Sequence, residues 1–306
     1  MELEKVRRTP GGNRHHFIAC YPGEGFPALS ITGGSCELRC ARCGGRYLSG
    51  MIDCREPERL HEICLELASR GAFGVLVSGG CNSEGYVPLE THLDAIQRVK
   101  DETNLFVAVH TGLLPAWLAR ELGRAGVDLA DFEIFGDGGT IPLATGLDRT
   151  PEDYLDSMRW LLRSVPHVVP HICVGAHRGR VVGELMAVEM LSGLDGVREL
   201  VFIVFTPTPG TSLGGAPPPE PGEVGKVICE ARRIFSGEIA LGCMRPRGRL
   251  REEYEMAALL SGVDRMEMPS PATVSAAREM GLRIGRMNAC CSVPLDARGW
   301  LEWSDA

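Results

Sequence analysis

The 306-residue sequence predicts an α/β fold, a (β/α)8 TIM-type barrel that is closed or partly open. Short apolar runs recur along the chain, and most do not alternate with polar residues, as expected of parallel strands covered on both faces. Helical patterns lie between these runs. Eight strand–helix units within about 250 residues match such a barrel, and an open doubly wound sheet is the alternative.

The predicted strands are rich in Val, Ile, Leu and Phe. They cover residues 28–32, 73–78, 105–110, 129–134, 167–174, 200–205, 239–241 and 263–268. In both candidate folds the active site is built from the loops that follow the carboxyl ends of the strands. The functional residues are therefore expected in these loops.

Two helices are well marked in the sequence. In the first, the apolar residues Leu60, Ile63, Cys64, Leu67 and Ala68 follow helical spacing, and Gly71 marks its end. In the second, Thr150 is the expected N-cap, Pro151 takes the first helical position, and Asp153 is an acidic residue in the first turn.

The chain divides into one large domain with short flanking segments. We expect an N-terminal extension over residues 1–20, the barrel over 21–269, and a C-terminal helix with a cysteine-containing tail over 270–306. The proline-rich stretch 216–222 is a stiff connector within the barrel.

Composition excludes several classes of function. A net charge of −8 argues against a primary role in binding nucleic acid. The longest apolar run, Leu200–Phe205, is too short to cross a membrane, and the first residues lack the pattern of a signal peptide. We therefore expect a cytoplasmic protein, in which twelve cysteines indicate metal or redox chemistry rather than disulfides.

Three of the cysteines, Cys36, Cys40 and Cys43, lie within eight residues directly after the first predicted strand. Thiolates are suitable ligands for a [4Fe–4S] cluster, and three of them leave one iron open. The alternative is a structural zinc site. Zinc normally takes four protein ligands from paired elements, and no second Cys pair of that spacing is nearby.

This C-x3-C-x2-C loop after the first strand of a barrel resembles the signature of radical S-adenosylmethionine (SAM) enzymes. The resemblance implies that Cys36, Cys40 and Cys43 bind a [4Fe–4S] cluster whose open iron is chelated by SAM. Cleavage of SAM then gives a 5′-deoxyadenosyl radical that abstracts hydrogen from substrate. Arg42 stands where the family usually has an aromatic residue before the last cysteine.

The same resemblance implies further SAM contacts at strand ends. Gly79 and Gly80 match the first two positions of the family's Gly-Gly-Glu segment, with Cys81 in the third. Glu133 is placed to accept hydrogen bonds from the SAM ribose. Val174 and Gly175 resemble the region that packs on adenine in biotin synthase-like members.

Other segments resemble biotin synthase relatives and the archaeal-type two-component lipoyl synthase. They are Phe205–Leu213, the stretch after Cys43, Leu241–Gly248 and the tail at Cys290 and Cys291. The resemblance implies sulfur insertion into an octanoyl-lysyl carrier protein, with an auxiliary iron–sulfur cluster as the sulfur source. The candidate ligands of that cluster are Cys81, Cys173, Cys243, Cys290 and Cys291, whereas Cys64 is expected in the core.

The expected partners are the lipoyl-carrier protein, an external electron donor and a second radical SAM subunit. Arginines after two strands, namely Arg178, Arg180, Arg245 and Arg247, either hold the SAM carboxylate and steer an acidic carrier or are ordinary surface charge. His110 and His171 are expected to be structural.

Two other functions remain open at this point. One is a radical SAM methyltransferase or cofactor maturase that acts on a small metabolite without a sacrificial cluster. The other is a noncatalytic subunit whose cluster is structural or carries electrons. The sequence does not determine the substrate or the oligomeric state.

Overall fold

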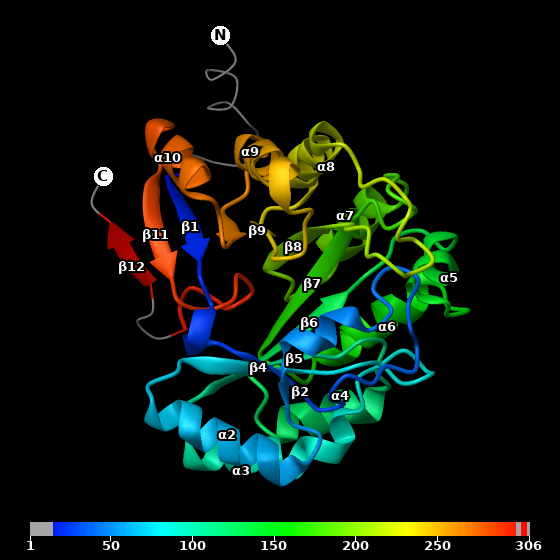
Figure 1. The fold of residues 1–306 in the computed structure, drawn as a ribbon, viewed down its shortest axis with the longest axis vertical. Helices are drawn as coiled ribbons and strands as arrows, with labels where there is room; N and C mark the ends of the chain where they lie inside the picture. Colours follow the sequence, from blue (N-terminus) through cyan, green and yellow to red (C-terminus); the bar gives the residue numbers. More distant parts are fainter. Residues whose placement is uncertain (1–14, 298–300, 305–306) are drawn as a thin grey trace.

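A single curled sheet organises the molecule in the computed structural model, which describes residues 15–297 and 301–304. Its twelve strands follow the order β12-β11-β1-β10-β9-β8-β7-β6-β5-β4-β2-β3. Helices cover the outer face, and the strands curve around a central space (Figure 1).

The eight predicted apolar runs all form strands of the barrel. They are β2 (Ala28–Ser30), β4 (Gly74–Ser78), β5 (Phe106–His110), β6 (Leu129–Glu133), β7 (His167–Val174), β8 (Glu199–Val204), β9 (Glu238–Leu241) and β10 (Arg265–Glu267). Each pairs in parallel with its neighbour in this series. The predicted fold class is confirmed, with the partly open form of the barrel.

Strands from both ends of the chain enlarge this sheet. β1 (His16–Cys20) lies between β10 and β11 (Arg283–Met287) and is parallel to both. β12 (Leu301–Ser304) is antiparallel to β11, and the short β3 (Ile52–Asp53) flanks β2. The segments expected as extensions therefore contribute strands to the sheet, which ends at β3 and β12 without closing.

Nine labelled α-helices accompany the strands. They are α2 (Pro57–Ser69), α3 (Leu93–Glu102), α4 (Ala116–Arg124), α5 (Thr140–Thr145), α6 (Pro151–Leu162), α7 (Glu184–Ser192), α8 (Pro221–Ile234), α9 (Arg251–Ser261) and α10 (Pro271–Glu279). In the described part of the chain, none is long and apolar enough to cross a membrane.

The two helices marked in the sequence are present. In α2 the residues Leu60, Ile63 and Cys64 are buried, which gives the helix its apolar contact with the sheet. At the start of α6, Thr150 and Asp153 form a reciprocal capping box ahead of Pro151. Cys64 is fully buried, as expected of a core residue.

The chain after β11, residues 288–297, packs in the interior of the barrel and is called the C-terminal segment below. Its residues Ala289, Cys291 and Val293 join one apolar cluster with Ala108, Leu129, Val169, Val201 and Ala240 from the strands. Arg265 anchors the segment by donating to the carbonyls of Cys291 at 3.0 Å and Val293 at 2.7 Å. The lower barrel is therefore filled by side chains, and the carboxyl ends of the strands are left for function.

Candidate active site

Cys36, Cys40 and Cys43 lie on one loop after β2, at the carboxyl edge of the barrel, and we call residues 31–45 the cysteine loop. All three thiols are partly exposed. Arg39 turns the chain between the first two cysteines with a φ of 42°, in the left-handed region that non-glycine residues seldom adopt. Gly44 and Gly45 adopt left-handed φ values of 56° and 79° directly after Cys43.

Contacts with the turn after β4 hold this loop. The hydroxyl of Thr32 accepts a hydrogen bond from the Gly80 N–H at 2.7 Å, and the Glu37 N–H donates to the Cys81 carbonyl at 2.9 Å. A Cβ on Gly80 would lie 2.0 Å from the Ser35 carbonyl oxygen and 2.5 Å from the Cα of Cys36. Only glycine permits this close approach, so Gly80 packs directly against the first predicted ligand.

The thiols are electrostatically prepared for metal binding. A hydrogen bond from the Cys40 thiol and another from the Gly45 backbone N–H lower the pKa of Cys43 to about 6, against the opposing effect of burial. The pKa of Cys40 is raised in turn by the same thiol–thiol hydrogen bond. One thiolate is thus favoured near neutral pH, and thiolates are the form that binds iron.

Arg42 and Glu133 form a two-point ion pair between the cysteine loop and the end of β6. Both terminal nitrogens of Arg42 donate to the carboxylate of Glu133, each at 2.5 Å. The Arg42 guanidinium also lies over the Phe135 ring, 5.6 Å from its centroid. Arg42, which departs from the family pattern, therefore binds Glu133, the residue predicted to contact the SAM ribose. The carboxylate oxygens of Glu133 retain further lone pairs for a ligand.

The loop after β8 packs on the cysteine loop. Leu213 N–H donates to the Ala41 carbonyl at 3.0 Å, and the Tyr47 hydroxyl lies 2.8 Å from that of Thr208. The segment Phe205–Leu213, which the sequence singles out as similar to biotin synthase relatives, is thus in contact with the predicted cluster ligands.

Val174 and Gly175 end β7 beside a tightly held turn. Gly175 has a φ of 82°, and the buried carboxylate of Glu184 accepts the N–H groups of Gly175 and Val182, each at 2.8 Å. A small pocket next to this turn is lined by Ile134, Phe135, Ala176 and Gly183, among others. This pocket lies where the resemblance places the adenine of SAM, and its lining also includes the polar side chains of Asp137, Thr140 and Glu184.

Ser78, His110, Asp131 and His171 form a polar layer inside the barrel, above the apolar filling. Side chains alternate along a strand, so His110 and Asp131 face inward two residues after the interior Ala108 and Leu129. Ser78 Oγ lies 2.9 Å from His110 Nδ1, and the Asp131 carboxylate lies 3.9 Å from a nitrogen of each histidine. Burial raises the pKa of Asp131 to about 6, and its Oδ1 has no hydrogen-bond partner among the described residues.

The two histidines of this polar layer are uncharged. Burial lowers the pKa of His110 and brings that of His171 to about 4, so both rings are neutral at pH 7. His110 retains 42% side-chain exposure and faces the open part of the barrel. Asp131 is a residue that sequence reasoning missed, although an acidic residue inside an apolar run was a usable signal.

The five cysteines considered for an auxiliary cluster fall into two groups. Cys81 and Cys173 lie on the cysteine-loop side, where burial raises the pKa of each to about 12, with Cys36 adding to the effect on Cys81. Cys290 and Cys291 lie beside Glu267 at the end of β10, and Cys243 follows β9, the strand next to β10. The structure does not bring the five thiols to one place.

The four arginines considered for binding SAM or a carrier also separate. Arg178, Arg180 and Arg247 are exposed. Arg245 is buried, and its guanidinium is paired with the buried carboxylate of Glu255 at 2.6 Å. The expectation for Arg245 was wrong, because its hydrogen-bonding groups are used inside the protein and do not reach a ligand.

Comparison with known proteins agrees with this architecture. No protein-family model matches the chain. A biotin synthase of Pelotomaculum thermopropionicum is 26% identical over 258 residues, covering 82% of this chain and 78% of that protein.

Two solved structures share the fold. A methylornithine synthase (PylB) superposes with a TM-score of 0.58 at 16% identity, covering 88% of this chain and 76% of its own. HydG, a maturase of the [FeFe]-hydrogenase, gives a TM-score of 0.63 at 13% identity, covering 94% of this chain and 67% of the HydG chain. Likeness at this level of identity establishes the barrel, and function must be argued from the site.

Proposed function

We propose that this radical SAM enzyme uses Cys36, Cys40 and Cys43 to hold a [4Fe–4S] cluster that reductively cleaves SAM. Its assignment to the radical SAM superfamily is supported by the sequence similarity to a biotin synthase and by the barrel that it shares with PylB and HydG. The observation that carries the proposal is the placement of three thiols on a strained, glycine-flanked loop at the carboxyl edge of the barrel. When bound, the cluster and SAM supply a 5′-deoxyadenosyl radical that removes hydrogen from a substrate carbon.

The protein's own residues have separate tasks in this proposal. Gly80 lets the β4 turn approach Cys36 closely, so its backbone and that of Gly79 can reach the amino group of SAM. Glu133, held by Arg42, is oriented toward the ribose side of the site. The turn at Val174 and Gly175, fixed by Glu184, offers an apolar surface for adenine.

For the reaction itself we propose sulfur insertion into an octanoyl-lysyl carrier protein, in the cytoplasm and without oxygen. Support comes from the resemblance to lipoyl synthase components and from the thiols beyond the three cluster ligands that lie around the barrel mouth. Insertion at an unactivated C–H bond requires a carbon radical, which acid–base catalysis cannot supply. An electron donor and a second radical SAM subunit belong to this proposal.

The polar layer favours a second candidate, a cofactor maturase or methyltransferase acting on a small metabolite. An octanoyl chain entering the barrel would meet Asp131 and the two histidines, and would leave Oδ1 of the buried carboxylate without a hydrogen-bond partner. A metabolite carrying N–H groups would instead satisfy the free Oδ1 of Asp131.

The central proposal is tested by reconstituting the protein anaerobically, adding dithionite and SAM, and measuring 5′-deoxyadenosine by mass spectrometry. We expect product from the wild type and from Cys229→Ser, a half-buried thiol on α8, and none from Cys36→Ala, Cys40→Ala or Cys43→Ala. Absence of product from the wild type, or full activity in any of the three variants, would refute the proposal.

The two reactions are separated by adding an octanoyl-lysyl carrier domain. Sulfur insertion predicts a carrier whose mass rises by the added sulfur, together with faster 5′-deoxyadenosine formation. If the carrier changes neither quantity while SAM is still cleaved, the second candidate is favoured.

A further inference from the structure

Glu267, Cys290 and Cys291 form a compact set of metal-binding side chains on the other wall of the barrel from the cysteine loop. Their ligand atoms all lie within 4.8 Å of one another. Glu267 ends β10, and the cysteines belong to the C-terminal segment, whereas the cysteine loop follows β2; strands β4 to β9 separate β2 from β10 in the sheet. The set is therefore separate from the predicted SAM site.

Two more thiols lie on the strands or loops next to β10. Cys20, at the end of β1, is the direct sheet partner of Glu267. Cys243 is an exposed thiol on the loop that follows β9, the other neighbour of β10.

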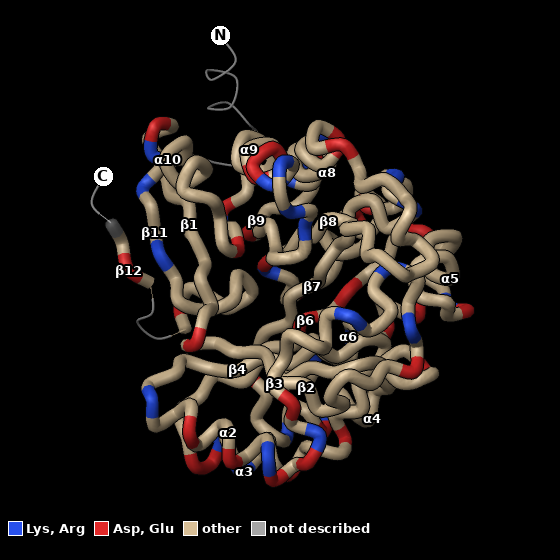
Figure 2. The backbone as a smooth tube through the Cα atoms, in the orientation of Figure 1, with Lys and Arg blue, Asp and Glu red and all other residues tan. Residues whose placement is uncertain are grey.

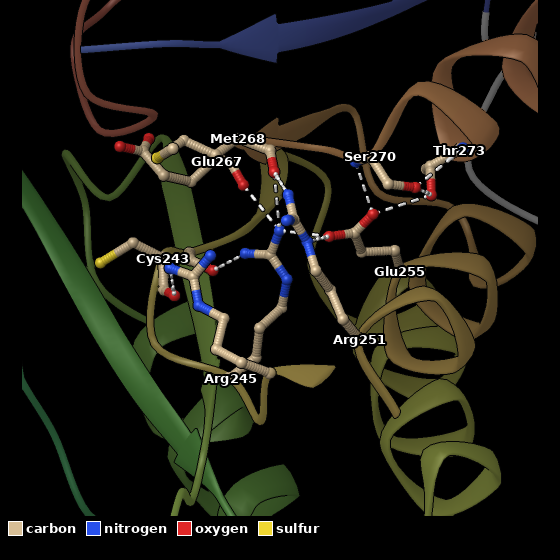
Figure 3. A network of polar contacts seen from close by, with 10 residues as sticks. Cys243, Arg245, Arg251, Glu255, Glu267, Met268, Ser270 and Thr273 are labelled. Atoms are coloured by element: carbon tan, nitrogen blue, oxygen red, sulfur yellow. Dashed lines mark hydrogen bonds and ion pairs between the residues drawn. The ribbon is translucent and has the colours of Figure 1, made fainter. Parts of the chain in front are cut away.

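Nothing in the described residues compensates this carboxylate with an ion pair. Glu267 is 3% exposed, and its carboxylate accepts a hydrogen bond from the Cys291 N–H. The adjacent Arg245 gives its donors to the Glu255 carboxylate and to the backbone carbonyls of Gly242, Glu267 and Met268 (Figure 3). A buried carboxylate beside thiols is unfavourable without a cation, and a bound metal ion would provide one.

Hydrogen bonds hold the ligand-bearing segments in position. Glu267 Oε2 accepts the Cys291 N–H at 2.8 Å, and Arg265 fixes the Cys291 carbonyl. Arg245 joins the residue before Cys243 to the end of β10, donating to Gly242 O at 2.7 Å and Glu267 O at 2.8 Å (Figure 3). The backbone around the ligands is thus fixed independently of their side chains.

We propose that Glu267, Cys290 and Cys291 bind a thiophilic metal centre. A two-thiolate, one-carboxylate set suits zinc or iron, either as a single ion or as an iron–sulfur cluster, with a further coordination position left for another ligand. Tetrahedral bonds of about 2.3 Å to sulfur place neighbouring ligand atoms roughly 3.7 Å apart, which is compatible with the spacing here. Binding forms metal–thiolate bonds and releases the thiol protons to solvent.

Such a centre would tie the C-terminal segment to β10. Metal binding would then be coupled to closure of the barrel interior, because two of the ligands lie on the segment that fills it. The proposal does not depend on radical chemistry at Cys36, Cys40 and Cys43.

The test uses the full chain with its first cluster reconstituted, and in parallel a Cys36→Ser/Cys40→Ser/Cys43→Ser variant. Iron, zinc and acid-labile sulfide are measured per chain, and Co²⁺ is titrated while its thiolate absorption is followed. We expect one Co²⁺ per chain or an equivalent content of native metal in both proteins. Metal in excess of the first cluster without extra sulfide indicates a single ion, and matching extra iron and sulfide indicate a second cluster.

Variants assign the ligands. Cys290→Ser/Cys291→Ser should abolish this binding, Glu267→Gln should weaken it at least tenfold, and Cys229→Ser should leave it unchanged. Cys290 is partly exposed, so Cys290→Ser alone, which should also weaken binding at least tenfold, tests the site even if the double variant does not fold. The proposal is overturned if the wild type binds no stoichiometric metal at this site, or if binding survives in the folded double variant. Loss of SAM cleavage with retained Co²⁺ binding would count against the proposed function alone.

Discussion

The guanidinium of Arg42 and the carboxylate of Glu133 meet through two hydrogen bonds of 2.5 Å each, joining the cysteine loop to β6 across 91 positions of sequence. Both side chains are less than one-third exposed. This pair therefore fixes the cysteine loop against β6, the strand that ends with Glu133.

Arg42→Met should separate these two elements. We expect it to lower the free energy of unfolding by about 1–3 kcal/mol, because it leaves a half-buried carboxylate without its cation. A double-mutant cycle with Glu133→Gln, followed by anaerobic urea unfolding, should give a coupling energy of about 1 kcal/mol or more. Additive effects of the two substitutions would contradict a specific pair.

Gly80→Ala should impair the cluster site without unfolding the barrel. The added methyl group would overlap the Ser35 carbonyl and the Cα of Cys36, so the cysteine loop must move. We expect iron retention and 5′-deoxyadenosine formation to fall at least tenfold. Gly34→Ala is the matched control in the same loop, because no atom lies within 4 Å of its added Cβ. Equal behaviour of the two variants would argue against the close approach of Gly80 and Cys36.

Asp131→Asn should stabilise the protein in the absence of substrate. The pKa of Asp131 in the folded protein, about 6, exceeds the ordinary value of 3.8, so the ionised carboxylate destabilises the fold. This destabilisation is complete above pH 6 and fades as the pH falls toward 4. At about 1.4 kcal/mol per pKa unit, the difference between about 6 and 3.8 corresponds to a gain of about 3 kcal/mol at pH 7.5, which should shrink toward pH 5.

Thermal unfolding of wild type and Asp131→Asn between pH 5 and 8 measures this gain. If Asp131 binds substrate, the same variant should also lose turnover, which a purely structural residue would not do while gaining stability. A variant less stable than wild type at pH 7.5 would show that the carboxylate is satisfied in the native protein.

Glu255→Gln should have the opposite effect on stability. Burial alone would raise the pKa of Glu255, but hydrogen bonds from Arg245, the Ser270 backbone and Arg251 lower it to about 2 (Figure 3). Its contribution is therefore present above pH 4.5 and lost as the pH falls toward 2. Removing the charge leaves buried Arg245 uncompensated and should cost about 3 kcal/mol at pH 7.

The control for this prediction is Glu252→Gln, an exposed acidic residue on the same helix, α9. Denaturant unfolding at pH 7 should separate the two variants clearly. Similar stabilities would contradict the role assigned to the Arg245–Glu255 pair.

The strands of the barrel could be predicted because each is a short apolar run in its own right. The four strands outside this series, β1, β3, β11 and β12, were not predicted, because their patterns are brief; β11, for example, also exposes Arg283 and Arg286. The cysteine loop was recognisable from local spacing alone.

Features that depend on distant pairing were not predictable. No local pattern indicates that the C-terminal segment enters the barrel and brings Cys290 and Cys291 to Glu267. The five cysteines considered for an auxiliary cluster could therefore not be divided into two groups from the sequence. Likewise, Arg42 and Glu133 become partners only when the barrel curls. Charged residues are concentrated on the outer helices, while the few inside carry these long-range contacts (Figure 2).

The position of β1 has a consequence for how the protein is made. This strand is synthesised well before both of its partners, β10 and β11, which lie about 250 residues later. The sheet around β1 therefore cannot be completed until β10 and β11 have been made, and until then its edge must be kept from other chains. We expect the pairing of β1 to be a late and slow step of folding.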